Sequence, residues 1–422
     1  MRLKAFHSAR RRAIVAVTVL TVLATVTLGG AAGPYEEPAD RPVAQTLPPE
    51  LAKSVYHTVK DPIAADGYML HFNVNSTFGP YEVTGIGALR KLVRELYAIG
   101  ELQKIKGTEA WAKQVKDSAT SPLQFTYKMI TSPVDTLSGV PKGLYKGAEA
   151  VYTSATTERD PSQDSRTATL LLQSGKKREY AANLGVDPYS SNALLQKELN
   201  SVGWAAALGS WTVTAASAPI SGVASTVISV TKMGDAVGDY LKAEGPSDLR
   251  ARNDKRLTEM GITAAVIQKY LDHKAFTPRH DTVITEALAG LDGVRGRQVF
   301  LEAALKAEDE VDANLYMTMA QILRGYHLGV SRLTEIREMS GLLIAQSQGG
   351  AAMIPFPLDY GVWRQAGDHL SDRVKAGYAA QGFNGKFEIW VTGKVSPSAK
   401  QGYAAKNITI VEEAGRRIEI LD

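Results

Sequence analysis

The residues that come nearest to a catalytic motif are Ala345-Gln346-Ser347-Gln348-Gly349, which approach the G-x-S-x-G nucleophile elbow of serine hydrolases. Asp359 and His369 follow Ser347 in the order serine, aspartate, histidine. An elbow needs a strand before the serine and a helix after it, but residues 350–357 predict a second strand because their two prolines oppose a helix. The sheet that should precede an elbow is also missing from the mostly helical sequence upstream. We therefore expect Ser347 to lie in a hairpin turn, and hydrolysis by Ser347 is kept as an alternative.

The residue types give little support to thiol or metal chemistry. The chain has no cysteine, which excludes disulfides, thiol catalysis and cysteine-ligated zinc or iron–sulfur centres. Its histidines form no HExxH motif and no pair at helical spacing. Asp272-His273 and His280-Asp281 flank a loop that contains Pro278, and we expect solvated loop residues there instead of a metal site. The seven histidines are His7, His57, His71, His273, His280, His327 and His369.

The sequence also carries weak signals for nucleotide and acid chemistry. Gly85-Ile86-Gly87 lies between a predicted strand and a predicted helix, but Arg90 stands where a dinucleotide-binding turn has its third glycine. No GxxxxGK[ST] loop occurs. The acidic run at 308–312 predicts a solvated helix face, because consecutive acids on a helix point in different directions. The sequence thus indicates no catalytic residue, no metal site and no cofactor, and favours a protein that is not an enzyme.

The first 32 residues predict a secretory signal peptide. A basic segment, a 16-residue apolar run and small residues at 29–32 follow one another in the order that such signals require. An uncleaved anchor helix is the alternative, since residues 13–32 approach the length that spans a bilayer. Residues 1–32 hold five of the 48 Lys and Arg side chains and no acid, so the rest of the chain, with 44 acids, has a net charge of −1. The excess of basic over acidic residues in the whole chain is therefore no evidence for a nucleic-acid partner.

The most unusual tract is 199–231, which contains no Asp, Glu, Lys or Arg. Small residues recur every four positions, and Pro219 divides the tract into halves that are each too short to span a bilayer. We expect a buried helical hairpin, and a hairpin that inserts into a membrane is the alternative. Trp204 and Trp211, seven residues apart, fit core packing as well as a membrane interface. Gly139, Gly143 and Gly147 form a similar small-residue stripe on a predicted helix.

The hydrophobic periodicity predicts a mainly α fold with a small α+β C-terminal module, in which an N-terminal β-hairpin leads into a multi-helix body. The hairpin is expected at 68–84, and strands are expected near 342–344, 353–356, 386–393 and 407–413, with one more suggested at 416–421. Helices are expected from 86 towards 116 and at 167–184, 193–208, 252–260, 262–272, 282–291 and 296–330, the last continuing helically to 339, and then at 361–379 and 397–405.

These elements group into five segments along the chain. They are a signal peptide (1–32), a flexible leader (33–55), a β-hairpin with helices (56–152), a helical body (153–340) and a small α/β module (341–422). Residues 153–166 are expected to form a linker or surface loop at the start of the helical body.

Three functions are compatible with this organisation. The first is a non-enzymatic scaffold or interaction protein, exported across the cytoplasmic membrane of a bacterium to the periplasm or the medium. The second is a membrane-associated protein that docks or inserts through residues 199–231. The third is a serine hydrolase that uses Ser347. The expected partner is an unidentified protein or a membrane surface, and no nucleic acid is expected.

Overall fold

The computed structural model describes residues 35–106, 161–207 and 232–421. The predicted signal peptide, the glycine stripe at 139–147 and most of the uncharged tract lie outside these residues. Only 199–207 of that tract is described, as the second half of a helix in which Trp204 is buried. In the part of the chain that is described, no helix combines the length and the apolar character needed to cross a bilayer.

The N-terminal part is a small antiparallel sheet with one long helix. Strand β3 (Leu70–Ser76) pairs on one edge with β1 (His57–Val59) and β2 (Ala64–Ala65) and on the other with β4 (Gly79–Thr84). Leu70, Phe72 and Val74 are buried, as their alternation predicts. Helix α4 (Ile86–Lys106) follows directly and packs against this sheet. The predicted hairpin and the predicted helix start are both confirmed.

The described part of the expected flexible leader is instead folded. Helices α2 (Val43–Thr46) and α3 (Pro49–Ala52) lie within it, and Leu47 and Leu51 are buried in the same core as the N-terminal sheet. Arg41 forms a β-bridge with Ile63. Three of the prolines that suggested flexibility, Pro42, Pro48 and Pro49, lie at helix starts, where a missing N–H costs nothing.

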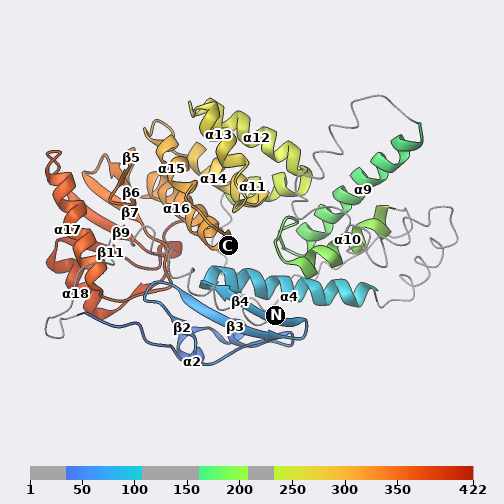
Figure 1. Cartoon of the computed structure of the whole chain (residues 1–422), viewed down its shortest axis with the longest axis horizontal. Helices are drawn as coiled ribbons and strands as arrows, with labels where there is room; N and C mark the ends of the chain where they lie inside the picture. The colour runs from blue at the N-terminus through green and yellow to red at the C-terminus, as the bar shows by residue number, and fades with distance from the viewer. Residues whose placement is uncertain (1–34, 107–160, 208–231, 422) are drawn as a thin grey trace.

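The middle of the chain is helical, as expected. Figure 1 shows α9 and α10 beside the distal half of α4, and α11 to α16 stacked between them and the C-terminal sheet. Helix α9 covers residues 161–166, where the sequence suggested a linker. The helices are α9 (Pro161–Asn183), α10 (Ala193–Ala207), α11 (Lys232–Ala243), α12 (Pro246–Glu259), α13 (Ala264–Leu271), α14 (Pro278–Ala289), α15 (Arg297–Ala304) and α16 (Glu310–Gly329).

The segment 296–339 differs from the expected continuous helix in two ways. It breaks after α15, and Asp309 starts α16 as a new helix by accepting hydrogen bonds from the amides of Val311 and Asp312. After α16 the chain forms strand β5 (Leu333–Met339), not more helix. Ser340 and Gly341 both have positive φ, which is the backbone of the tight two-residue turn that joins β5 to its antiparallel neighbour.

The C-terminal sheet has five strands in the order β11-β9-β7-β6-β5. Strands β5, β6 (Leu342–Ser347) and β7 (Ala351–Pro355) form an antiparallel meander. Strands β7, β9 (Lys386–Trp390) and β11 (Ile408–Val411) are parallel, and they are connected through α17 (Gln365–Ala379) and α18 (Pro397–Ala405). The short strands β8 (Tyr360–Gly361) and β10 (Lys394–Val395) form a separate parallel pair. Residues 416–421, where a further strand was suggested, contain none.

Both faces of this sheet are covered. Leu343, Ala345 and Met353 belong to the core shared with the helical body, whereas Leu342 and Ile354 pack under α17. Figure 1 shows the same three layers, with α17 and α18 on the outer side of the sheet and α16 on the inner side. The sheet is therefore integrated into the body, and the boundary expected at 340/341 falls inside the β5–β6 turn.

The expected fold class, mainly α with a small α+β module, is wrong. Helices make up 53% and strands 18% of the described residues, with three sheets, one of them five-stranded. The fold is mixed α/β. The prediction failed because the residues of β5 were predicted as helix. The largest sheet therefore lacked one strand in the prediction and was interpreted as a small separate module.

Candidate functional site

The structure does not assemble the suggested serine triad. Ser347 ends β6, and strand β7 follows the turn, so the expected hairpin is confirmed and the helix of an elbow is replaced by a strand. The Ser347 hydroxyl accepts a hydrogen bond from the amide of Ala351 at 3.0 Å. Ser347 precedes β7 and Asp359 follows it, so the two lie beyond opposite ends of a five-residue strand.

Asp359 has a structural role at a distant helix. Its carboxylate accepts hydrogen bonds from the amides of Leu70 (3.0 Å) and Ile86 (3.1 Å), and the second of these caps the N-terminus of α4. Burial raises the pKa of Asp359 to about 6, against the lowering effect of both amides and of Arg90. Gly85, whose φ is +96°, makes the sharp strand-to-helix turn that brings these amides together. The Gly85–Gly87 segment is therefore a turn capped by a carboxylate of the C-terminal sheet region.

His280 is a buried helix cap. Its Nδ1 accepts a hydrogen bond from the amide of Thr277, and its Nε2 lies 3.1 Å from the side-chain oxygen of Asn314. Burial lowers its pKa to about 4, so the ring is neutral near pH 7. Asp281, on the next position, is buried beside Tyr270, and burial raises its pKa well above the ordinary value.

Asp272 and His273, on the other side of the same loop, also contact other residues of the protein. Asp272 pairs with Arg250 at 3.1 Å, and the His273 ring packs edge-on against Phe276. Within the described ranges, no three His, Asp or Glu side chains are grouped so that they could hold a metal ion.

The acidic run at 308–312 is a helix N-terminus and not a mid-helix face. Asp309 caps α16, and Asp312 accepts a hydrogen bond from the amide of Glu308. Burial raises the pKa of Asp312 to about 6. Glu310 forms an ion pair with Lys91 of α4 at 2.7 Å. These acids thus stabilise the start of α16 and its contact with α4.

A feature that the sequence did not predict is an apolar pocket between the C-terminal sheet and its outer helices. It extends along the sheet face below α17 to the carboxyl ends of the parallel strands β7, β9 and β11. In open α/β sheets, this end of the strands is where ligands most often bind. Aliphatic and aromatic side chains make up nearly all of its wall, among them Ile354, Leu358, Leu370, Val374, Phe387 and Ile389.

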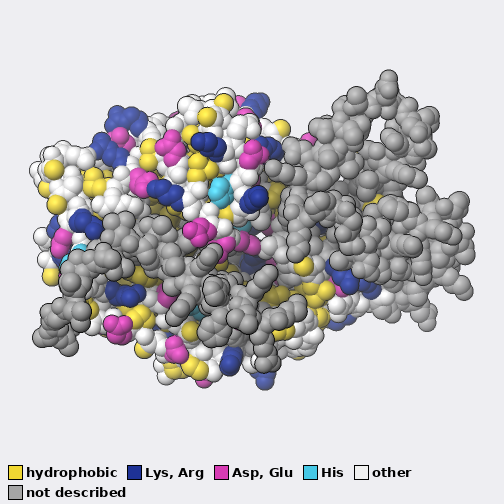
Figure 2. All heavy atoms as spheres, viewed as in Figure 1, with side chains coloured by type: hydrophobic (Ala, Val, Ile, Leu, Met, Phe, Trp, Pro, Cys, Tyr) yellow, Lys and Arg dark blue, Asp and Glu magenta, His cyan; other side chains and the backbone are white. Residues whose placement is uncertain are grey.

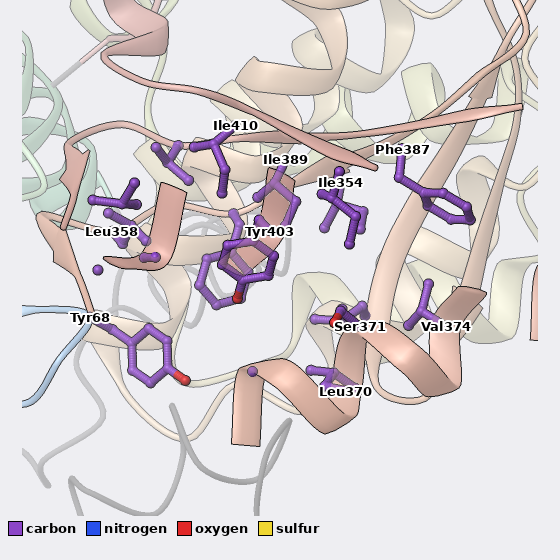
Figure 3. A pocket seen from close by; sticks show the side chains of 18 of the residues that line it. Tyr68, Ile354, Leu358, Leu370, Ser371, Val374, Phe387, Ile389, Tyr403 and Ile410 are labelled. Carbon is purple, nitrogen blue, oxygen red and sulfur yellow. The ribbon is translucent and has the colours of Figure 1, made fainter. Parts of the chain in front are cut away.

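Three hydroxyl groups interrupt this apolar wall, which also includes Lys375, whose ammonium group donates to the carbonyl of Lys406. Figure 3 shows Tyr68, Tyr403 and Ser371 around the pocket, where they come from the segment before β3, from α18 and from α17. Burial raises the pKa of both tyrosines, so the phenols are protonated and can donate a hydrogen bond at neutral pH. Ser371 already donates to the carbonyl of Asp368 at 2.6 Å.

The N-terminal segment fixes the helices that cover the pocket. Ser396 caps α18 by accepting a hydrogen bond from the amide of Ala399, and its hydroxyl donates to the carboxylate of Glu36. Glu36 also accepts a hydrogen bond from the amide of Trp363 at 2.8 Å. The Tyr35 hydroxyl donates to Asp368 of α17 at 2.6 Å. Residues 35 and 36 therefore hold α17 and α18 in place over the pocket.

Ring packing completes the wall around Tyr403. The Trp363 ring meets the Tyr403 ring edge-on, with centroids 4.9 Å apart, and Tyr68 packs against Phe356 at 5.8 Å. Tyr68 precedes β3 in the N-terminal sheet, and its carbonyl accepts hydrogen bonds from the amides of Asp359 and Tyr360. The pocket thus closes at the junction of two sheets that are far apart in sequence.

The size of the pocket limits what it can hold. Its volume is about 60 Å³. A single water molecule needs roughly 10–15 Å³ on the same measure, so the space suits a molecule of about four to six atoms of that size. An apolar wall disfavours water, and the hydroxyls can orient one polar atom. The pocket can therefore bind, but it shows no nucleophile paired with a base that would do chemistry on its occupant.

Comparison with protein-family models, curated proteins and solved structures found no match to this chain.

Proposed function

We propose that this protein is a non-enzymatic binding protein that takes up a small apolar molecule with one polar atom in the pocket beneath α17 and α18. The observation that carries the proposal is the combination of an apolar wall with hydroxyl-bearing side chains at the carboxyl ends of parallel strands. The signal-like residues 1–32 support a place of action outside the cytoplasm, in the periplasm or the medium.

The hydroxyls support a ligand with a hydrogen-bond acceptor or a hydroxyl of its own. A purely apolar ligand would make no hydrogen bond with the phenol groups of Tyr68 and Tyr403, whereas one such hydrogen bond contributes about 0.5–1.5 kcal/mol. Cyclopentanol and cyclopentane are suitable probes, because they differ by one hydroxyl and fall within the size that the pocket volume allows. Cyclopentanol is expected to bind more tightly than cyclopentane.

The test compares these probes by ligand-observed NMR titration of the whole chain. Ala399 lies in the pocket wall on α18 and is 1% exposed, so Ala399→Leu is expected to fill the space and abolish binding of both probes. Ala405→Leu is the matched control, because Ala405 is exposed on the same helix. Tyr403→Phe should weaken cyclopentanol binding about three- to tenfold and leave cyclopentane binding unchanged, as the loss of one hydrogen bond predicts.

Two results would contradict the proposal. One is that neither probe binds at millimolar concentration to the folded protein. The other is that Ala399→Leu, checked by circular dichroism to be folded, binds both probes like the Ala405→Leu control.

A further inference from the structure

A second cavity lies between helix α4 of the N-terminal part and helices α9, α11 and α14 of the helical body. Helices α4, α9 and α11, the loop 185–188 and the start of α14 enclose about 450 Å³. This volume falls within the range of roughly 300–1,000 Å³ that small-ligand sites occupy. Figure 2 shows basic and acidic side chains intermixed in the middle of this face of the molecule.

The basic groups of the cavity come from every surrounding helix. Arg178 bonds to the carbonyls of Lys242 and Ala243 and so fixes the C-terminal end of α11 against α9. Lys91 forms its ion pair with Glu310 at 2.7 Å on the floor. A guanidinium has five donors, so an arginine that already has a protein partner can also bind a carboxylate. The basic residues of the lining are Lys91, Arg94, Arg178, Lys242 and Arg279.

The acidic groups lie in the same cavity. Glu95, on the floor, is buried and accepts hydrogen bonds from Ser190 (2.5 Å) and Asn192 (3.0 Å). Asp235 and Asp239 are exposed on one side of α11, four residues apart. Neither forms an ion pair with another residue of the described ranges. Asp187, in the loop after α9, is the fourth acid of the lining.

Gly238 keeps the α11 side of the cavity open. It lines the cavity with Gly234, Asp235 and Asp239, and of the two glycines only Gly234 has close neighbours where a Cβ would lie. A Cβ atom added at Gly238 would meet no heavy atom within 4 Å, so the space beside this position is empty in the described chain. Gly185, whose φ is +66°, likewise has open space around it. The cavity is therefore not closed by its own side chains.

We infer that this cavity binds a short peptide through its two oppositely charged ends, with the ammonium group at Asp235 and Asp239 and the carboxylate at the basic residues of α4 and α14. The lining carries both charge signs, so a simple anion would meet four acids and a simple cation would meet five bases. A zwitterion satisfies both groups at once. Charge-assisted hydrogen bonds of this kind are stronger than neutral ones and give the site its specificity.

The experiment measures binding of trialanine by isothermal titration calorimetry on the whole chain. N-acetyl-trialanine and trialanine amide are the ligand controls, because each lacks one of the two charges. Trialanine is expected to bind at least about tenfold more tightly than either, which is the effect of losing a hydrogen bond to a charged group. Asp239→Asn should weaken trialanine about tenfold, and Asp292→Asn, exposed outside the cavity, should not.

A filling variant separates loss of the site from loss of the fold. Gly238→Leu places a side chain in the empty space without a clash and should abolish binding, whereas Gly329→Leu, exposed at the end of α16, should leave it intact. The inference is overturned if the two blocked peptides bind as tightly as trialanine. It is also overturned if trialanine does not bind at millimolar concentration, or if folded Gly238→Leu binds it like the wild-type protein.

Discussion

Asp359 links the C-terminal sheet to the N-terminal sheet and helix α4, and its removal is expected to change how stability depends on pH. The carboxylate is buried and accepts hydrogen bonds from the amides of Leu70 and Ile86. Asp359→Asn keeps the size and one acceptor oxygen but cannot ionise. The variant therefore removes the titration of this group and preserves most of its packing.

The magnitude follows from the pKa. Burial raises the pKa of Asp359 to about 6 from an ordinary value of 3.8, so the folded state holds the proton more tightly than the unfolded state does. The stability that this provides is fully present below pH 3.8 and is lost as the pH rises through 6. A shift of about two pH units corresponds to roughly 3 kcal/mol.

The assay is urea unfolding of the wild type and of Asp359→Asn between pH 4 and pH 8, followed by circular dichroism. The free energy of unfolding of the wild type, relative to the variant, should fall by about 2.4 kcal/mol from pH 4 to pH 7, because part of the full difference is already lost at pH 4. Asp40→Asn reports the effect of the same exchange at an exposed position. A difference that rises with pH would refute the reasoning, because it would mean that the two amides and the N-terminus of α4 outweigh burial.

Further outcomes are expected from single changes elsewhere. Gly296→Ala should destabilise the folded protein by more than about 2 kcal/mol, because φ is +80° and a Cβ would lie 2.0 Å from a carbonyl oxygen. Gly382→Ala, with similar φ and open space, should cost only about 1 kcal/mol, and thermal unfolding measures both. Because the pKa of His280 is about 4, its neutral form contributes roughly 3 kcal/mol to the free energy of unfolding at pH 7, and this contribution is lost as the pH falls from 6.5 to 4. In urea unfolding, His280→Gln should therefore lack this pH dependence. Asp309→Ala should lower the melting temperature through about 1 kcal/mol of lost capping. A fluorophosphonate probe should not label Ser347, and labelling that disappears in Ser347→Ala would restore the hydrolase alternative.

The local hydrophobic periodicity was sufficient to predict those helices and strands that bury one face. The alternation of Leu70, Phe72 and Val74 predicted β3, and the helical spacing after Ile86 predicted α4. The same reasoning failed at 331–339, where the short strand β5 has the polar and charged residues of an edge strand and only Leu333 and Ile336 are buried. The Ser340-Gly341 dipeptide was the available signal, because such pairs favour turns, and two successive residues with positive φ form the turn of a β-hairpin.

The two proposed binding sites could not be predicted from the sequence, and the reason is a different one. The apolar pocket joins Tyr68 to Tyr403, and the charged cavity joins residues of α4 to residues of α11 and α14. None of these groups has neighbours in sequence that mark it as functional. Valines, isoleucines and leucines that line a pocket have the same periodicity as those that fill a core, so the sequence pattern does not distinguish the two.

By itself, the sequence determined the absence of thiol chemistry, the signal-like first 32 residues, the near-zero charge of the remainder and most of the individual helices and strands. These are properties of composition and of local periodicity, which depend on residues close together in the chain. The tertiary structure alone decided that the sheet is a central layer, that Asp359 caps a helix more than 270 residues away, and that the apolar pocket and the charged cavity remain open. Each of those depends on contacts between distant segments, and burial, pKa and cavity shape arise only when such segments pack together.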